Sequence, residues 1–153
     1  MLAATLEGRG TLQAGTTGGH VELDGTRIDI TRLAYARRET DWDLDGELAL
    51  GRGRLQLAGV VHGAAEPLGA ELDLDWRDLD LPASLVGQAL RSAGKLRVEG
   101  SSERYSADGA LQLGPPGRLA DIRLKLDGTP QRIRLEELAV VQRSGRLAAS
   151  GTV

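Results

Sequence analysis

Several residue types are scarce or absent in this chain of 153 residues, and each absence excludes a class of structure or chemistry. There is no cysteine, which excludes a disulfide framework and thiolate metal sites. Phenylalanine is also missing, and with two Trp, two Tyr and one Met the aliphatic residues must supply nearly all of the apolar surface. No apolar run approaches the roughly 18 residues that a membrane-spanning helix needs.

The shortage of catalytic groups argues against an enzyme. The only two histidines, His20 and His62, stand far apart in the sequence without a nucleophile and an orienting carboxylate beside them. Two histidines without cysteine do not assemble a convincing zinc site either. The net charge of −3 is unfavourable for binding nucleic acid. We therefore predict no catalytic residues, no metal, no cofactor and no nucleic-acid partner.

Short motifs that resemble active sites each have a simpler explanation. Gly8-Arg-Gly10 and Gly51-Arg-Gly53 begin like dinucleotide-binding loops but lack the final glycine and the following helix. Ser92 and Lys95 have the serine–lysine spacing of penicillin-binding enzymes, without the companion motifs. The acidic runs at residues 41–45 and 73–80 alternate with apolar residues, which is typical of the solvated face of a strand.

What the chain has in abundance is alternation. Residues 121–153 alternate apolar and polar side chains in short runs separated by turn residues, the pattern of half-buried strands. The alternation slips by two residues at Glu136 and Glu137 and then resumes. Residues 21–48 repeat this pattern, including the two-residue slip. We therefore predict a single segment over 1–153 with internal repeats at about 21–48 and 122–153.

A smaller unit recurs within these repeats, with a glycine at an apolar position of the alternation. It occurs at residues 42–48, 55–61, 105–111 and 147–153. One interpretation is that the neighbouring backbone comes close or the strand bends there. The other is a line of narrow points along a shared apolar trough. We predict a short helix only near residues 82–92, because Leu81, Leu85 and Leu90 have near-helical spacing.

The predicted fold is all-β: an elongated rolled sheet of repeated amphipathic strands with a hydrophobic trough and one short helix near 82–92. Such an aliphatic face suits acyl chains or apolar strands better than a polar ligand. Its predicted lining consists of residues from the two repeats: Ile28, Ile30, Leu33, Trp42, Leu44, Leu48, Ile122, Leu124, Leu126, Ile133, Leu135, Leu138, Val140 and Leu147.

The second half of the chain resembles the TamB family, the translocation and assembly module subunits of Gram-negative bacteria. The resemblance lies in the order of Trp76-Arg-Asp-Leu-Asp-Leu-Pro82, Gly94-Lys-Leu-Arg-Val-Glu-Gly100, Tyr105, the turn at Gly128 and Ser150-Gly151-Thr-Val153. It implies a periplasmic segment of a protein anchored in the inner membrane, with a sheet rolled into a trough called a β-taco. It also implies work with the outer-membrane protein TamA in outer-membrane biogenesis and autotransporter secretion, or in phospholipid transport.

The expected function is therefore a non-enzymatic conduit or chaperone segment that shields phospholipid acyl chains or nascent outer-membrane protein strands. Contact with TamA is expected through the full-length protein rather than through this segment. The alternatives are a segment of a related AsmA-like phospholipid-transport protein and a structural spacer whose apolar face is a closed core. Because terminal strands of a cut sheet expose unpaired backbone groups, we also expect edge-to-edge self-association.

Overall fold

The computed structural model describes residues 2–23, 26–64, 66–83 and 87–152, and these residues form eleven strands in one antiparallel sheet. The strands are β1 (Leu2–Gly10), β2 (Ala14–Leu23), β3 (Thr26–Arg38), β4 (Asp41–Leu50), β5 (Gly53–His62), β6 (Gly69–Leu81), β7 (Leu90–Ser101), β8 (Tyr105–Gly114), β9 (Ala120–Thr129), β10 (Arg132–Gln142) and β11 (Gly145–Thr152).

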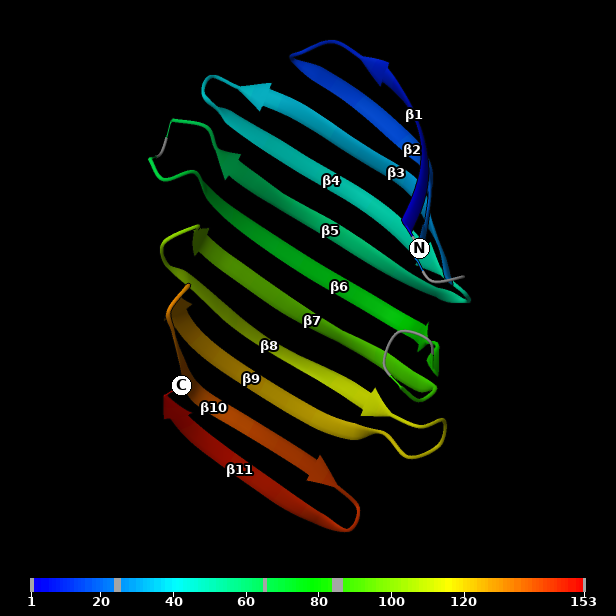
Figure 1. Ribbon diagram of the computed structural model, residues 1–153, viewed down its shortest axis with the longest axis vertical. Helices are drawn as coiled ribbons and strands as arrows, with labels where there is room; N and C mark the ends of the chain where they lie inside the picture. Colours follow the sequence, from blue (N-terminus) through cyan, green and yellow to red (C-terminus); the bar gives the residue numbers. More distant parts are fainter. Residues whose placement is uncertain (1, 24–25, 65, 84–86, 153) are drawn as a thin grey trace.

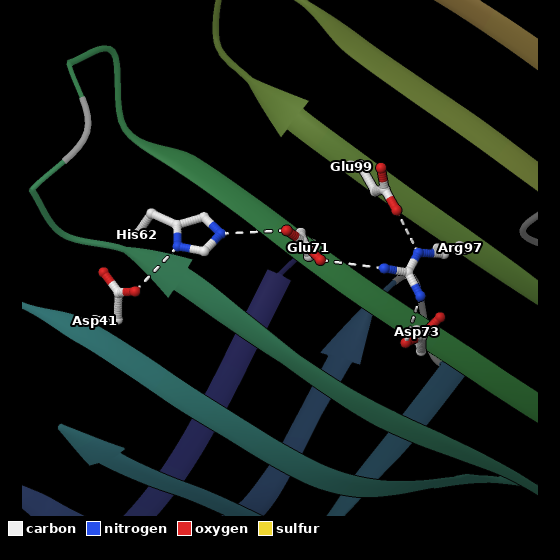
Figure 2. Close-up of polar contacts among 6 residues, drawn as sticks. All are labelled: Asp41, His62, Glu71, Asp73, Arg97 and Glu99. Atoms are coloured by element: carbon white, nitrogen blue, oxygen red, sulfur yellow. Dashed lines mark hydrogen bonds and ion pairs between the residues drawn. The ribbon is translucent and has the colours of Figure 1, made fainter. Parts of the chain in front are cut away.

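The strand order in space is the order in the sequence, from β1 to β11 (Figure 1). The sheet does not close, because β1 and β11 lie at opposite edges and do not pair with each other. The sheet is coiled, and in Figure 2 the N-terminal strands cross behind β5 and β6 at a steep angle. The prediction of an all-β, elongated rolled sheet is confirmed.

Of the described residues in the predicted helix near 82–92, Ala83 is helical and residues 87–92 are not, so the predicted C-terminal bound is wrong. Leu90 begins β7, and Gly87 to Ala89 are neither helix nor strand. The Gly87 N–H donates a hydrogen bond of 2.8 Å to the Ala83 carbonyl, which is the i to i−4 spacing of a helical turn. Residues 84–86 of the prediction, Leu85 among them, lie outside the described residues. Leu81 and Leu90 are instead opposite each other across β6 and β7. Strand pairing therefore overrides the near-helical spacing of these two leucines.

Bulges keep the apolar residues of each strand on one face. In β3 the pairing with β4 shifts between Ile30 and Arg32, so that Ile30 and Leu33 point to the same side. β10 has the corresponding shift after Leu135 in its pairing with β9. At each slip, two polar residues follow each other and interrupt the alternation. One extra residue in that strand keeps the apolar side chains before and after the slip on the same face. The slips read from the sequence are therefore β-bulges at matching places in the two repeats.

The sheet is a single layer. The accessible surface of the chain is 10448 Å², whereas a compact monomer of 16.2 kDa would expose about 7,500 Å². Among the described residues the buried apolar side chains are only Ala120 and Ala139, and no large side chain is fully buried. Close contacts lie between strands that neighbour each other in the sheet, with a few more between β4 and β6. Among the described residues, neither face of the sheet is thus covered by a second layer.

No helix in the described residues has the length and apolar composition needed to cross a membrane.

Candidate functional site: the apolar face of the sheet

The strand register places the predicted lining residues on one face of the sheet, which we call the apolar face. In the N-terminal half, Ile28 of β3 is opposite Leu50 of β4, and Ile30 is opposite Leu48. In the C-terminal half, Leu126 of β9 is opposite Leu135 of β10. The remaining members follow the same parity and lie on the same face: Leu33, Trp42, Leu44, Ile122, Leu124, Ile133, Leu138, Val140 and Leu147. Their common face is a result of the register; their role in binding stays a prediction.

The middle of the apolar face was missing from the predicted lining. β5 to β8 join the two repeats with an uninterrupted series of apolar residues on the same side. Its large members are Leu55, Leu57, Val61, Leu72, Leu74, Trp76, Leu96, Val98, Tyr105 and Leu111. Their alternation is as regular as that of the two repeats, so the sequence alone could have identified them. The predicted lining was limited to residues of the two repeats. The apolar face therefore extends from β3 to β11, whereas the same side of β1 and β2 carries mainly Gly, Ala and Thr besides Leu6 and Val21.

Most aliphatic side chains on this face are half-buried by their neighbours within the sheet. Exposure rises toward the β11 edge, where Ile133 is 45% and Leu147 61% exposed. A polar pair also lies on this face, because Trp76 donates a hydrogen bond of 2.8 Å from Nε1 to Oγ of Ser92, which is only 4% exposed. The face therefore presents aliphatic surface in which this indole donor is already satisfied.

Glycines on the apolar face are covered by their cross-strand neighbours. A Cβ on Gly59 would lie 2.1 Å from the carbonyl oxygen of Glu71 and 2.8 Å from a methyl group of Leu72. A Cβ on Gly109 would lie 2.5 Å from the carbonyl oxygen of Lys95 and 2.8 Å from a methyl group of Leu96. These contacts favour the first interpretation of the glycine unit, a close approach of neighbouring strands. Leu72 and Leu96 occupy the space beside these two glycines, so the apolar face has no depression there.

The opposite face, which we call the polar face, carries the acidic runs. The carboxylates of β4 pair with basic groups on the strands beside it: Asp45 with Arg32, and Asp43 with Arg38. On β6, Asp75 lies 2.9 Å from Lys95 Nζ of β7. No group of three or more potential metal ligands occurs among the described residues. These runs are charged strand faces whose members pair across the sheet, and such exposed pairs contribute little stability each.

The longest connected set of polar contacts crosses β4 to β7 (Figure 2). His62 of β5 lies between Asp41 and Glu71, with Nδ1 3.1 Å from Asp41 Oδ2 and Nε2 3.5 Å from Glu71 Oε1. Arg97 then contacts Glu71 at 3.1 Å and Asp73 at 3.7 Å, and also pairs with Glu99. The hydrogen bond to Asp41, followed by the charges of both carboxylates, raises the pKa of His62 above its ordinary value of 6.5.

The raised pKa of His62 predicts a pH-dependent stability. Protonated His62 is favoured in the folded state, so its contribution is complete below about pH 6.5, the pKa of an unpaired histidine. The contribution is lost as the pH rises through the higher folded-state pKa. Thermal unfolding followed by circular dichroism is expected to show a melting temperature that falls above pH 6.5, and His62→Gln should flatten this dependence.

His20→Gln is the matched control for this experiment. His20 has no ion pair among those that the structure shows for the described residues. An equal flattening by both variants, or an unchanged profile in His62→Gln, would contradict the assignment to the Asp41–His62–Glu71 contacts.

The clearest hollows lie on the polar face. One, of about 840 Å³, runs across the strands between two rows of charged side chains, with Asp45, Asp73 and Arg97 among its walls. A second, of about 680 Å³, has smaller walls at Ala93, Ala110 and Ala139. Both are gaps between long side chains over the backbone of the sheet. Acidic and basic groups alternate along the larger one, so it has no net preference for an anion or a cation.

No protein-family model, no curated protein and no solved structure matches this chain.

Proposed function

We propose that this chain is a conduit or chaperone segment whose apolar face shields acyl chains of phospholipids during outer-membrane biogenesis. The observation that carries the proposal is an apolar face that spans β3 to β11 and has no second layer of described residues packed on it. Soluble monomers rarely expose contiguous apolar patches larger than a few hundred Å², and larger ones mark interaction sites. A closed core, as in a structural spacer, would require large side chains with almost no exposure, and the described residues contain none.

The chemistry of the apolar face favours acyl chains over polypeptide as its occupant. Its side chains are mainly Leu, Ile and Val, and the Trp76 indole already bonds Ser92. A lipid tail has no hydrogen-bonding groups, whereas a polypeptide has backbone N–H and C=O groups that must be paired when they are buried. Nascent outer-membrane protein strands remain the second occupant to be distinguished by experiment, because an extended strand can add to an open sheet edge.

The cellular setting is part of the same proposal and rests on the resemblance to the TamB family. We place the segment in the periplasm, within a protein anchored to the inner membrane, and expect TamA to contact other parts of that protein. The related AsmA-like phospholipid-transport proteins share the proposed chemistry. The proposal includes no catalysis and no cofactor, so the apolar face itself is the functional feature.

Charge placed on the apolar face provides the first test. Leu124→Asp and Leu135→Asp each put a carboxylate beside the proposed acyl chain, which loses apolar contact and must lie next to a charge. The affinity for a fluorescent polyene fatty acid should fall at least about tenfold, equivalent to about 1.4 kcal/mol. Ala110→Asp on the polar face of β8 is the matched control and should bind the probe normally. Circular dichroism should confirm that all three variants remain folded.

Photo-crosslinking in cells identifies the occupant. A photoreactive residue at Leu126 faces the apolar side, and one at Lys125 is its control on the polar side. Capture of phospholipid at 126 and not at 125 supports the proposal. Capture of polypeptide at 126 instead would assign the face to nascent strands. Capture of neither, together with normal probe binding by the Leu124→Asp and Leu135→Asp variants, would overturn the proposal and favour a structural spacer.

A further inference from the structure

Charged side chains on the polar face are mostly matched by a charge of the other sign directly across the strands. Such pairs attract, whereas like charges in directly opposite positions repel. Examples of matched pairs are Arg32–Glu47, Asp73–Arg97, Asp75–Lys95 and Asp108–Lys125. Among the described residues, two directly opposite pairs carry like charges instead. The acidic one joins Glu71 and Glu99. The basic one joins Arg54 of β5 and Arg77 of β6.

The acidic pair is bridged by one arginine. Arg97 contacts Glu71 at 3.1 Å and also pairs with Glu99, so that a single guanidinium group serves both carboxylates (Figure 2). The planar guanidinium offers several N–H donors in a fixed arrangement and is well suited to two acceptors at once. The repulsion between the two glutamates is thus offset by a shared ion of opposite charge.

The basic pair has no shared counter-ion among the described residues. Arg54 Nη1 lies 3.3 Å from Glu47 Oε1. Arg77 Nε lies 3.8 Å from Oδ1 of a different carboxylate, Asp75, which Lys95 Nζ approaches more closely, at 2.9 Å. The side chains of Arg54 and Arg77 are 76% and 82% exposed. Both guanidinium groups are therefore accessible, and no carboxylate contacts the two of them together.

A hollow of about 340 Å³ lies beside the basic pair and is also lined by a third arginine, Arg52, from the turn between β4 and β5. Arg52 Nε is 3.5 Å from Oδ2 of Asp80, and Arg91 shares that carboxylate at 3.3 Å. Two aspartates, Asp75 and Asp78, line the hollow as well. Three arginines against two carboxylates leave this hollow with a positive charge, unlike the larger one on the same face.

We propose that Arg52, Arg54 and Arg77 bind a phosphate group in this hollow. Guanidinium groups donate paired N–H groups in a fork that matches the oxygens of a phosphate. One phosphate accepts hydrogen bonds from two arginines at once, and so acts for the basic pair as Arg97 does for the acidic pair. The phosphate is either the free anion or part of a lipid headgroup, and the experiment below separates the two. The site lies on the polar face, so this inference is independent of the occupant proposed for the apolar face.

A titration with inorganic phosphate, followed by nuclear magnetic resonance at constant ionic strength, tests the site directly. The amide signals of residues 52–54 and 77–78 should shift with a dissociation constant in about the millimolar range, because each exposed ion pair contributes little. Arg54→Gln and Arg77→Gln should each weaken binding about fivefold, equivalent to about 1 kcal/mol. Without phosphate, these two variants lose a like-charge repulsion and should not melt at a lower temperature than the wild type.

Two further variants separate a phosphate site from a general effect of charge. Arg123→Gln is the matched control, since Arg123 is an exposed arginine of the polar face whose partners across the sheet are Ala110 and Ala139. This variant should bind phosphate as the wild type does. Asp78→Asn removes a negative charge from the hollow and should tighten binding about fivefold. Asp78 has a φ of 50°, which asparagine also tolerates, so the backbone is preserved.

Vesicles distinguish the two sources of phosphate. Flotation compares vesicles of phosphatidylglycerol and phosphatidylcholine in equal parts with vesicles of phosphatidylcholine alone. A preference for the anionic vesicles that is lost in Arg54→Gln and Arg77→Gln, and kept in Arg123→Gln, assigns the site to a lipid headgroup. Binding of inorganic phosphate without any such preference assigns it to the free anion.

Three results would overturn the proposal. The first is a wild-type chain that neither responds to phosphate more than to chloride nor prefers the anionic vesicles. The second is an equal loss of binding in Arg123→Gln and Arg77→Gln, which would show an effect of overall charge. The third is an unchanged phosphate affinity in both Arg54→Gln and Arg77→Gln. Circular dichroism of each variant distinguishes loss of folding from loss of binding.

Discussion

Replacing Gly109 with valine is expected to destabilise the sheet by about 3 kcal/mol. The new Cβ would lie 2.5 Å from the Lys95 carbonyl oxygen and 2.8 Å from a methyl group of Leu96. The first neighbour is backbone and cannot move without disturbing the hydrogen bonds between β7 and β8. Because a typical domain has only about 5–15 kcal/mol of stability, the loss should be visible as a large shift in the urea midpoint.

Gly151→Val is the matched control, since Gly151 occupies the same place in the recurring glycine unit. A Cβ on Gly151 meets no atom within 4 Å. Valine is a better strand former than glycine, by up to about 1 kcal/mol, so this variant should be neutral or slightly more stable. Urea unfolding gives both values. Equal destabilisation by the two substitutions would mean that the clash at Gly109 is relieved by small shifts and that glycine is needed for another reason.

Replacing Trp76 with alanine is expected to cost about 2–3 kcal/mol, less than for a fully buried tryptophan because this indole is half-buried. The change removes the large ring opposite Gly94, which is the Cα partner of Trp76 across β6 and β7. It also removes the donor to Ser92 Oγ, leaving a hydroxyl that is only 4% exposed without this partner.

Trp76→Phe separates these two effects. Phenylalanine keeps most of the ring contact but loses the N–H donor, so it should cost about 1 kcal/mol. Unfolding is followed by circular dichroism, because removing Trp76 leaves Trp42 as the only fluorescent tryptophan. If the phenylalanine variant is as unstable as the alanine variant, the hydrogen bond dominates. If neither variant loses stability, the ring contributes no packing on this open face.

Local pattern was enough to predict the strands and the side to which their residues point. Alternation at residues 121–153 predicted β9 to β11, and the slip at Glu136 and Glu137 proved to be a bulge in β10. Both depend on neighbours within a few residues, which a sequence displays directly. The C-terminal bound of the helix predicted near 82–92 was wrong, because Leu90 pairs with Leu81 of β6 and residues 87–89 are neither helix nor strand.

The surroundings of the two faces could not be predicted in the same way. Whether Leu57 or Leu124 is covered depends on whether distant segments pack over it, and alternation is the same in either case. The partners of His62 likewise come from β4 and β6, at positions fixed by strand register. The close approach at Gly59 and Gly109 involves backbone atoms of neighbouring strands, and the recurring glycine unit left it as one of two interpretations.

The order of the strands also determines how the sheet can assemble. Each strand pairs only with the strands directly before and after it in the sequence, so loop closures are short throughout. Contact order is therefore low for an all-β protein, and folding should be faster than in sandwiches that pair distant strands. Stability is close to a sum of nearest-neighbour terms, as in repeat proteins, so the sheet can fray one strand at a time from either end. Length can then be gained or lost by whole hairpins without redesigning the remainder.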